Sequence, residues 1–188
     1  MAYDFDGAAT KIEIDDVLTN ELANTTVGSW SAWVKPTVGI PGSIKKILSF
    51  GDTDADSRLE IYILSTTGTF LAVAREAGTN QWVIDTDTSP FVDNVWTHIA
   101  IVQDGTSPVL YIDGVAVAQA FITDTDKTFW FNDIAGLDNG RIGAENNDST
   151  GDNNFFDGSI SDVRIYNYAL SPTQIQQMYN REYNLLAK

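Results

Sequence analysis

Acidic side chains at alternating positions are the residues of this chain that could do chemistry. The segment GDTDADSRLE carries Asp52, Asp54 and Asp56, followed by Glu60. Carboxylates at such spacing can converge on one hard cation, because Ca²⁺ binds several oxygen ligands at once. An EF-hand loop needs glycine where Ser57 stands, and its glutamate comes later in the loop. The segment is therefore not an EF-hand, and a solvated acidic turn is the favoured interpretation.

A single aspartate, Asp162, stands inside a run of strand-forming residues, SISDVRIYN. In a regular strand Asp162 and Arg164 share one face, and Val163 and Ile165 share the other. A carboxylate among such residues is unfavourable unless it is paired or bound to a metal. Two interpretations follow for Asp162: a metal ligand, or an ion pair with Arg164 or another base.

The residues of nucleophilic catalysis and of zinc binding are nearly missing from the sequence. The chain has no cysteine and one histidine, His98. His98 alternates with Trp96 and Ala100 on a predicted strand, which favours a packed side chain over a general base. Catalytic triads and zinc sites therefore lack their parts, and the redox compartment stays undetermined.

The composition is strongly acidic, with 26 Asp and Glu against 11 Lys and Arg and a net charge of −15. Such a surface repels phosphate backbones and anionic lipid heads, and no cluster of Lys or Arg is evident to offset it. We therefore expect no nucleic-acid partner, whereas divalent cations are favoured. No apolar run is long enough to predict a membrane span.

The N-terminus, MAYDFDGAAT, has neither a basic region nor an apolar run. It is not typical of a signal peptide. Two interpretations stay open: the sequence begins after a removed leader, or it starts natively inside a cell, as for a protein packaged into a virus particle.

Short β-strands are the elements that would position these side chains. The helical period is nearly missing before residue 171, and β-branched or alternating runs recur about every ten residues with Gly, Asp or Asn between them. The runs are KIEID, TVGSWSAWVKP, KKILSFG, RLEIYIL, TFLAVAR, QWVID, WTHIAIVQDG and PVLYIDGVAVA. This pattern predicts an all-β sandwich or barrel in a single domain over residues 1–188.

One hairpin and one long loop are predicted at the level of residues. The Asp-Gly pair at 113–114 favours a two-residue turn, so Leu110–Ile112 should pair with Val115–Val117. Residues 145–154, ENNDSTGDNN, contain no apolar side chain and should form an exposed loop.

A short helix is predicted to end the chain, over about 172–183. Ser171 is a suitable N-cap, Pro172 suits the first helical position, and Gln174 completes a capping box. Leu170 and Ile175 can then pack together at the helix entry. We expect this helix to cover one face of the sandwich as a structural element.

Five pieces of the sequence resemble, in order, laminin-G-like domains of the concanavalin A-like lectin/glucanase superfamily. They are SWSAWVKP, ILSFGD, WTHIAIVQDG, LYIDGVAV and DGSISDVRIYNYALSPTQI, of which the last is the most specific. The resemblance extends from YDFDG near the N-terminus to the helix. It implies a two-sheet antiparallel jelly roll with loops at its rims.

The resemblance also implies a structural calcium ion, bound by the aspartate of the D-x-R-I/V-Y strand. Carried over to this sequence, the ligands are Asp162, Asp6 in DFDG and the carbonyl of Gly51 in SFGD. Such an all-oxygen set suits Ca²⁺. Further oxygens at the Gly51 end would come from Asp52, Asp54 or Asp56.

Glucanases of the superfamily carry paired acids on one strand, in the pattern E-x-D-x-E. Here KIEIDDV offers Glu13 and Asp15 but has Val17 where the second glutamate belongs, and RLEIYIL offers Glu60 alone. We therefore expect a protein that is not an enzyme.

Glycan binding would need flat aromatic side chains beside amides and carboxylates. Trp33 and Trp96 lie in strongly patterned strands and are predicted to be core, whereas Trp82 and Trp130 lie at less regular places and are the better exposed candidates. The alternative roles of these tryptophans are core packing or a subunit contact. For the polar loop at residues 145–154, the alternative to ligand binding is simple exposure to solvent. Polar partners would come from the loop residues Asn146, Asn147, Asp148, Asp152, Asn153 and Asn154.

The hypothesis from sequence is a non-catalytic, calcium-stabilised recognition module, acting outside a cell or on a virion surface, with a glycan as its ligand. The alternative is a structural virion protein, a capsid decoration or tail component that binds other subunits or copies of itself. The acidity, the missing leader and the absent cysteines are compatible with that alternative. A glucanase is the least favoured of the three.

Overall fold

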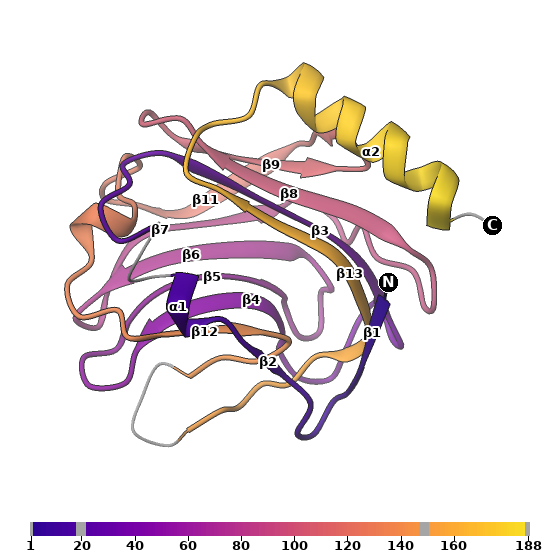
Figure 1. The fold of residues 1–188 in the computed structure, drawn as a ribbon, viewed down its shortest axis with the longest axis horizontal. Helices are drawn as coiled ribbons and strands as arrows, with labels where there is room; N and C mark the ends of the chain where they lie inside the picture. The colour runs from indigo at the N-terminus through magenta and orange to yellow at the C-terminus, as the bar shows by residue number, and fades with distance from the viewer. Residues whose placement is uncertain (1, 18–21, 147–150, 187–188) are drawn as a thin grey trace.

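The computed structural model describes residues 2–17, 22–146 and 151–186, and it consists of two antiparallel sheets. The six-stranded sheet contains, in spatial order, β1 (Ala2–Asp6), β13 (Asp157–Tyr166), β3 (Gly28–Pro36), β8 (Thr97–Gln103), β9 (Pro108–Ile112) and β10 (Val115–Ala116). The predicted two-sheet antiparallel jelly-roll sandwich is confirmed (Figure 1).

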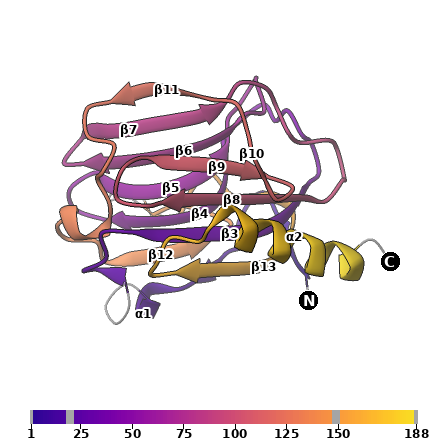
Figure 2. The ribbon, with the colours of Figure 1, turned by 90° about the horizontal axis from the view of Figure 1, so that it is seen from above.

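The seven-stranded sheet forms the other layer, and Figure 2 shows most of its strands stacked in order. It contains, again in spatial order, β11 (Gln119–Asp124), β7 (Thr79–Thr86), β6 (Phe70–Glu76), β5 (Ser57–Ile63), β4 (Lys45–Asp52), β12 (Asn139–Ile142) and β2 (Ile12–Glu13). Two short helical turns, α1 (Asp15–Val17) and η2 (Phe131–Asp133), lie in the connections.

The core lies between the sheets and follows from the alternation of side chains along each strand. On β5, Leu59 and Ile61 point inward and are buried, opposite Ala74 and Ala72 of β6. One continuous cluster of buried apolar side chains joins residues from Phe5 to Ile160, so both sheets contribute to it.

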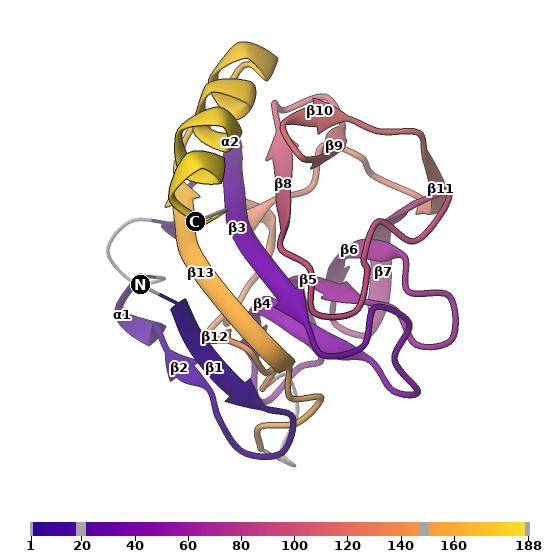
Figure 3. The ribbon, with the colours of Figure 1, turned by 90° about the vertical axis from the view of Figure 1, so that its right-hand side faces the viewer.

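The C-terminal helix α2 (Pro172–Leu186) packs against the outer face of the six-stranded sheet (Figures 1 and 3). Leu170 and Ile175 are buried there against Ala100 and Val102 of β8. The predicted capping box is confirmed, because Ser171 N–H donates to Gln174 Oε1 at 2.8 Å and Gln174 N–H donates to Ser171 Oγ at 3.3 Å. No described helix is both long and apolar enough to cross a membrane.

The predicted hairpin is confirmed between β9 and β10. Its turn residues Asp113 and Gly114 have φ values of 49° and 82°, the left-handed conformation that an Asp-Gly pair tolerates best. The turn lies under α2, where a side chain on Gly114 would meet Tyr179.

Strand β13 contains a β-bulge at Asp162, which the sequence pattern did not predict. Ser161 pairs with Trp33 and Arg164 pairs with Ser31, so three steps on β13 match two on β3. Asp162 therefore takes the extra position, with φ of 49°, and the predicted strict alternation through Asp162 and Arg164 is wrong. An aspartate is suited to this place because Asp tolerates the left-handed region better than most side chains.

Candidate functional site

The outward face of the seven-stranded sheet gathers charged side chains that are far apart in the sequence. Since Leu59 and Ile61 point into the core, Arg58, Glu60 and Tyr62 must point outward from β5. The strand register then places particular partners beside them: Arg75 opposite Arg58, Ser49 and Val73 opposite Glu60, Lys46 and Leu71 opposite Tyr62, and Arg141 opposite Ser49.

Arg58 and Arg75 form a directly opposed pair of like charges, which we call the arginine pair. Such a pairing is destabilising unless an anion lies between the two side chains. Asp56, in the β4–β5 turn, supplies that anion. Its carboxylate contacts Arg58 Nη1, and it lies 2.9 Å from Arg75 Nη2 and 3.0 Å from Arg75 Nε.

Both arginines are held by further contacts along the sheet. Arg58 Nε lies 2.9 Å from Glu60 Oε1, and Arg75 Nη1 donates to Asn80 Oδ1 at 2.8 Å. The side chains of Arg58 and Arg75 are 21% and 23% exposed, so solvent reaches this part of the face.

A buried triad, Lys46, Glu60 and Glu145, continues the charged network from the arginine pair. Lys46 Nζ lies 2.6 Å from Glu60 Oε2 and 2.8 Å from Glu145 Oε2, and it lies over the Tyr62 ring. Burial raises the pKa of Glu60 to about 7, with Lys46 opposing the shift. Burial also acts to raise the pKa of Glu145, but Lys46 and hydrogen bonds to Glu145 outweigh it, so that pKa lies below its usual value.

A second ionic group lies on the β12 side of the same face. Arg141 Nε donates to Asp152 Oδ1 at 2.8 Å, and Arg141 Nη1 also pairs with Asp15. Lys11, which directly precedes β2, also contacts Asp152. Burial acts to raise the pKa of Asp152, but the hydrogen bonds from Lys11 and Arg141 outweigh it. The pKa of Asp152 therefore lies below its usual value.

Basic residues therefore gather on this face, but each lies beside a carboxylate, so the group does not offset the acidity of the chain. Lys46, Arg58, Arg75 and Arg141 share one sheet face, although they lie far apart from one another in the sequence. Sequence reasoning missed them because strand register, rather than spacing along the chain, brings them together. The available indication was their outward position in alternating strands such as RLEIYIL and FLAVAR.

The three residues predicted as principal calcium ligands are not brought together. At one end of β1, Ala2 lies opposite Ser161, which is next to the bulge at Asp162. Asp6 lies at the other end of β1, opposite Asp157, and is therefore distant from Asp162 along the strand. Gly51 belongs to the other sheet, where it pairs with Asn139 and Arg58.

Each of these three residues also has an oxygen that is already used. The Gly51 carbonyl accepts the Asp138 N–H at 2.9 Å and the Asn139 side-chain amide at 3.0 Å. Asp6 Oδ1 accepts the backbone N–H groups of Ala8, Ala9 and Thr10, and these hydrogen bonds hold the pKa of Asp6 far below its usual value. Both carboxylate oxygens of Asp162 accept from Arg164 Nε, at 3.0 and 2.9 Å. The ion-pair interpretation of Asp162 is the one that these contacts support.

The acidic turn has local roles of its own. Asp52 Oδ1 accepts Asp54 N–H at 2.7 Å, Asp54 is exposed, and Asp56 bridges the arginine pair. Among the residues that the structure describes, no three His, Asp or Glu side chains are grouped to hold a metal ion. The predicted ligand set therefore does not fit calcium, and calcium binding stays a prediction without a site on these residues.

The two tryptophans predicted to be exposed are both fully buried, so that prediction is wrong. Trp82 points inward from β7 and donates to the Phe129 carbonyl at 2.9 Å, and its ring stacks on Trp130. Trp33 is buried as predicted, under Tyr179 of α2. Trp96, predicted to be core, is only partly buried and lies with Lys35 Nζ 5.3 Å from its ring centroid.

The polar loop folds back onto the protein in its described part. The backbones of Glu145 and Asn153 pair, the Asn154 side chain donates to Glu145, and the Asn153 amide donates to the Gly151 carbonyl at 3.1 Å. Asn146 is partly buried, and Asp152 is tied to Arg141. The candidate residues Asn147 and Asp148 lie outside the described residues.

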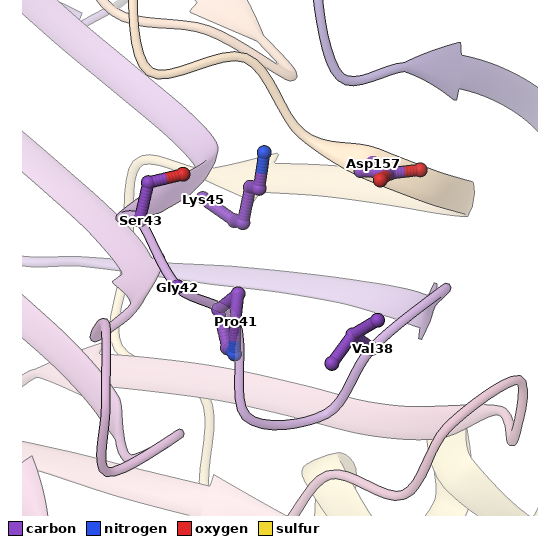
Figure 4. A pocket seen from close by; sticks show the side chains of 6 residues that line it. All are labelled: Val38, Pro41, Gly42, Ser43, Lys45 and Asp157. Atoms are coloured by element: carbon purple, nitrogen blue, oxygen red, sulfur yellow. The ribbon is translucent and has the colours of Figure 1, made fainter.

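A shallow pocket of about 270 Å³ lies at one rim of the sandwich (Figure 4). It is lined by Val38, Pro41, Gly42, Ser43, Lys45 and Asp157. Asp157 is engaged by Thr37 Oγ1 at 2.8 Å. The pocket offers a single cation, Lys45, so it is a weaker anion site than the arginine pair.

Comparison with known families agrees with this architecture. The family model described as "Concanavalin A-like lectin/glucanases superfamily", a laminin G model, matches residues 6–176. The chain belongs to this superfamily. The resemblance found in the sequence is thereby confirmed. A search of the curated proteins finds no significant match.

Solved structures of similar fold include chains from sialidases. The carbohydrate-binding module CBM40 of the Ruminococcus gnavus IT-sialidase is 18% identical, with a TM-score of 0.75, and the match covers 95% of this chain and 98% of that one. The same module bound to α2,3-sialyllactose gives a TM-score of 0.74. The leech intramolecular trans-sialidase is 22% identical, with a TM-score of 0.73, and the match covers 94% of this chain but only 27% of that one. At these identities the likeness shows a shared fold.

Proposed function

We propose that this protein is a non-catalytic module that binds glycans carrying a carboxylate, on the outward face of the seven-stranded sheet. The observation that carries the proposal is the arginine pair, because two guanidinium groups on adjacent strands match the planar geometry of one carboxylate. Val73 and Tyr62 lie on the same face but are only 4% and 8% exposed, so the proposal rests on the arginine pair and not on apolar contact with the sugar.

Two further observations support the proposal. The fold is shared with a sialidase carbohydrate-binding module that has been solved with α2,3- and α2,6-sialyllactose. The match to the leech trans-sialidase covers only 27% of that chain, so this fold accounts for a minor part of a larger enzyme there. A module of this kind would act at surfaces that display glycans, outside a cell or on a virion.

The proposal needs no calcium ion and no reaction. Glu60 has a raised pKa, but its carboxylate is committed to Lys46 and Arg58, so it serves to hold those cations in place. Roles in a virion assembly and as a homo-oligomer stay predictions, and mass measurement of the purified protein in solution tests the second of them.

The test is a glycan array followed by calorimetric titration with α2,3-sialyllactose and with lactose, which lacks the carboxylate. The expected result is binding of the sialylated sugar and none of lactose. Arg58→Ala should weaken binding about 10-fold or more, because a charged hydrogen bond contributes about 1.5–3 kcal/mol. Arg164→Ala, on the other sheet, is the matched control and should bind as the native chain does. Equal binding of both sugars, or an array without any acidic ligand, would refute the proposal.

A further inference from the structure

We infer that Asp56 is a built-in ligand of the arginine pair, which a carboxylate-bearing sugar must displace in order to bind. This inference rests on the proposed function, since it concerns the regulation of the same site. It assigns to the β4–β5 turn a role as an internal competitor.

The contacts of Asp56 are those of a bound carboxylate. One oxygen, Oδ1, contacts Arg58, and the other, Oδ2, lies within 2.9–3.0 Å of two nitrogens of Arg75. A free carboxylate on the outward face would make the same bridging contacts, because the groups are chemically identical. Asp56 and an acidic sugar therefore cannot occupy the arginine pair together.

The Asp56 side chain can leave without unfolding the turn. Its backbone is anchored by the Asp56 carbonyl, which accepts Gly78 N–H at 3.2 Å, while its side chain is 43% exposed. A change of side-chain rotamer into solvent is therefore sufficient to vacate the site. Arg58 and Arg75 would keep their contacts to Glu60 and Asn80, so the emptied pair would stay in position for a ligand.

The size of the effect follows from the competition. When only a fraction of the molecules is in the state that can bind, the apparent affinity equals the intrinsic affinity multiplied by that fraction. A partly exposed ion pair favours its closed form by roughly fivefold. Removing the Asp56 charge should thus tighten the binding of an acidic sugar on the order of fivefold.

The turn supplies a matched control. Asp54 lies two residues away in the same turn, is exposed, and carries the same charge. Asp56→Asn and Asp54→Asn therefore change the net charge equally, but only the first opens the arginine pair. Titration with α2,3-sialyllactose should show tighter binding for Asp56→Asn and a change of less than about twofold for Asp54→Asn. Equal affinities for the two variants, or weaker binding by Asp56→Asn, would overturn the inference.

A second measurement separates this inference from the proposed function. Acetate is titrated into ¹⁵N-labelled protein while the Nε–H resonances of Arg58 and Arg75 are followed. Acetate should shift both resonances in Asp56→Asn at concentrations that leave the native chain and Asp54→Asn unchanged. This result would support Asp56 as the internal ligand even if no glycan bound, in which case only the proposed function would fail. Resonances that do not respond in Asp56→Asn would overturn the inference, whatever the glycan array shows.

Discussion

Replacing Lys46 with methionine should destabilise the protein strongly and in a pH-dependent way. The Lys46 side chain is 4% exposed and its ammonium group contacts Glu60 and Glu145, whose side chains are 1% and 7% exposed. Methionine keeps most of the apolar stem but removes the charge. Two buried carboxylates then lose the cation between them.

The magnitude follows from this burial. Removing one partner of a buried ion pair typically costs about 3–5 kcal/mol, because an uncompensated charge is left inside the protein. Arg58 still contacts the other oxygen of Glu60, so the lower end of that range is expected. For a chain of this length each kcal/mol lowers Tm by about 2–4 °C, so Tm should fall by about 10 °C at pH 8.

The loss should shrink as the pH is lowered to 5. Burial raises the pKa of Glu60 from its ordinary value of 4.5 to about 7, so the folded state holds a proton there that the unfolded state has released. Stability from this group is therefore present below pH 4.5 and is lost as pH rises through 7. Without Lys46, which opposes the shift, the pKa of Glu60 rises further, so the variant suffers most at high pH.

Urea denaturation at pH 5 and pH 8 measures both effects. Lys45→Met is the matched control, because Lys45 is adjacent, less buried and has no described ion pair. It should change the free energy of unfolding by less than about 0.5 kcal/mol. A loss for Lys46→Met below about 1 kcal/mol, or an equal loss at both pH values, would refute the buried triad as the cause.

Four further predictions concern other parts of the fold. Asp162→Asn should cost no more than about 1 kcal/mol in urea denaturation, because its pair with Arg164 is partly exposed. Since the predicted ligands lie apart, EDTA should leave the Tm of the native chain unchanged, whereas a fall in Tm would support calcium binding at other residues. Trp82→Ala should cost about 3–5 kcal/mol in the same assay, since the ring is fully buried. Ser171→Ala should cost about 1 kcal/mol through the lost cap, with reduced helical circular dichroism.

The parts of the fold that local physics decides could be predicted from the sequence. The Asp-Gly turn at 113–114 and the capping box at Ser171 need only neighbouring residues, and both form as expected. The alternation of RLEIYIL likewise predicts a strand with a buried face, which β5 has. These features depend on intervals of a few residues, which a single sequence displays directly.

The site could not be predicted in the same way, because it depends on register between distant strands. Arg58 and Arg75 are separated by the whole β5–β6 hairpin, and a slip of one residue would turn one of them into the core. The bulge at Asp162 is such a slip, and it undid the predicted alternation on β13. For Trp82 the indication was present, because it alternates with Ile84, but the irregular surroundings of QWVID concealed it.

The distribution of exposure indicates where on the charged face a ligand can compete. Every cation there already has a carboxylate partner, so an anionic ligand must exchange with one of them. Lys46 and Arg141 are 4% and 8% exposed, and exchange there would require opening the buried network. At the arginine pair, both the guanidinium groups and the carboxylate of Asp56 are reachable from solvent. An acidic protein can thus recognise an acidic ligand where its own carboxylate is the most easily displaced, while the buried triad keeps Arg58 in position through Glu60.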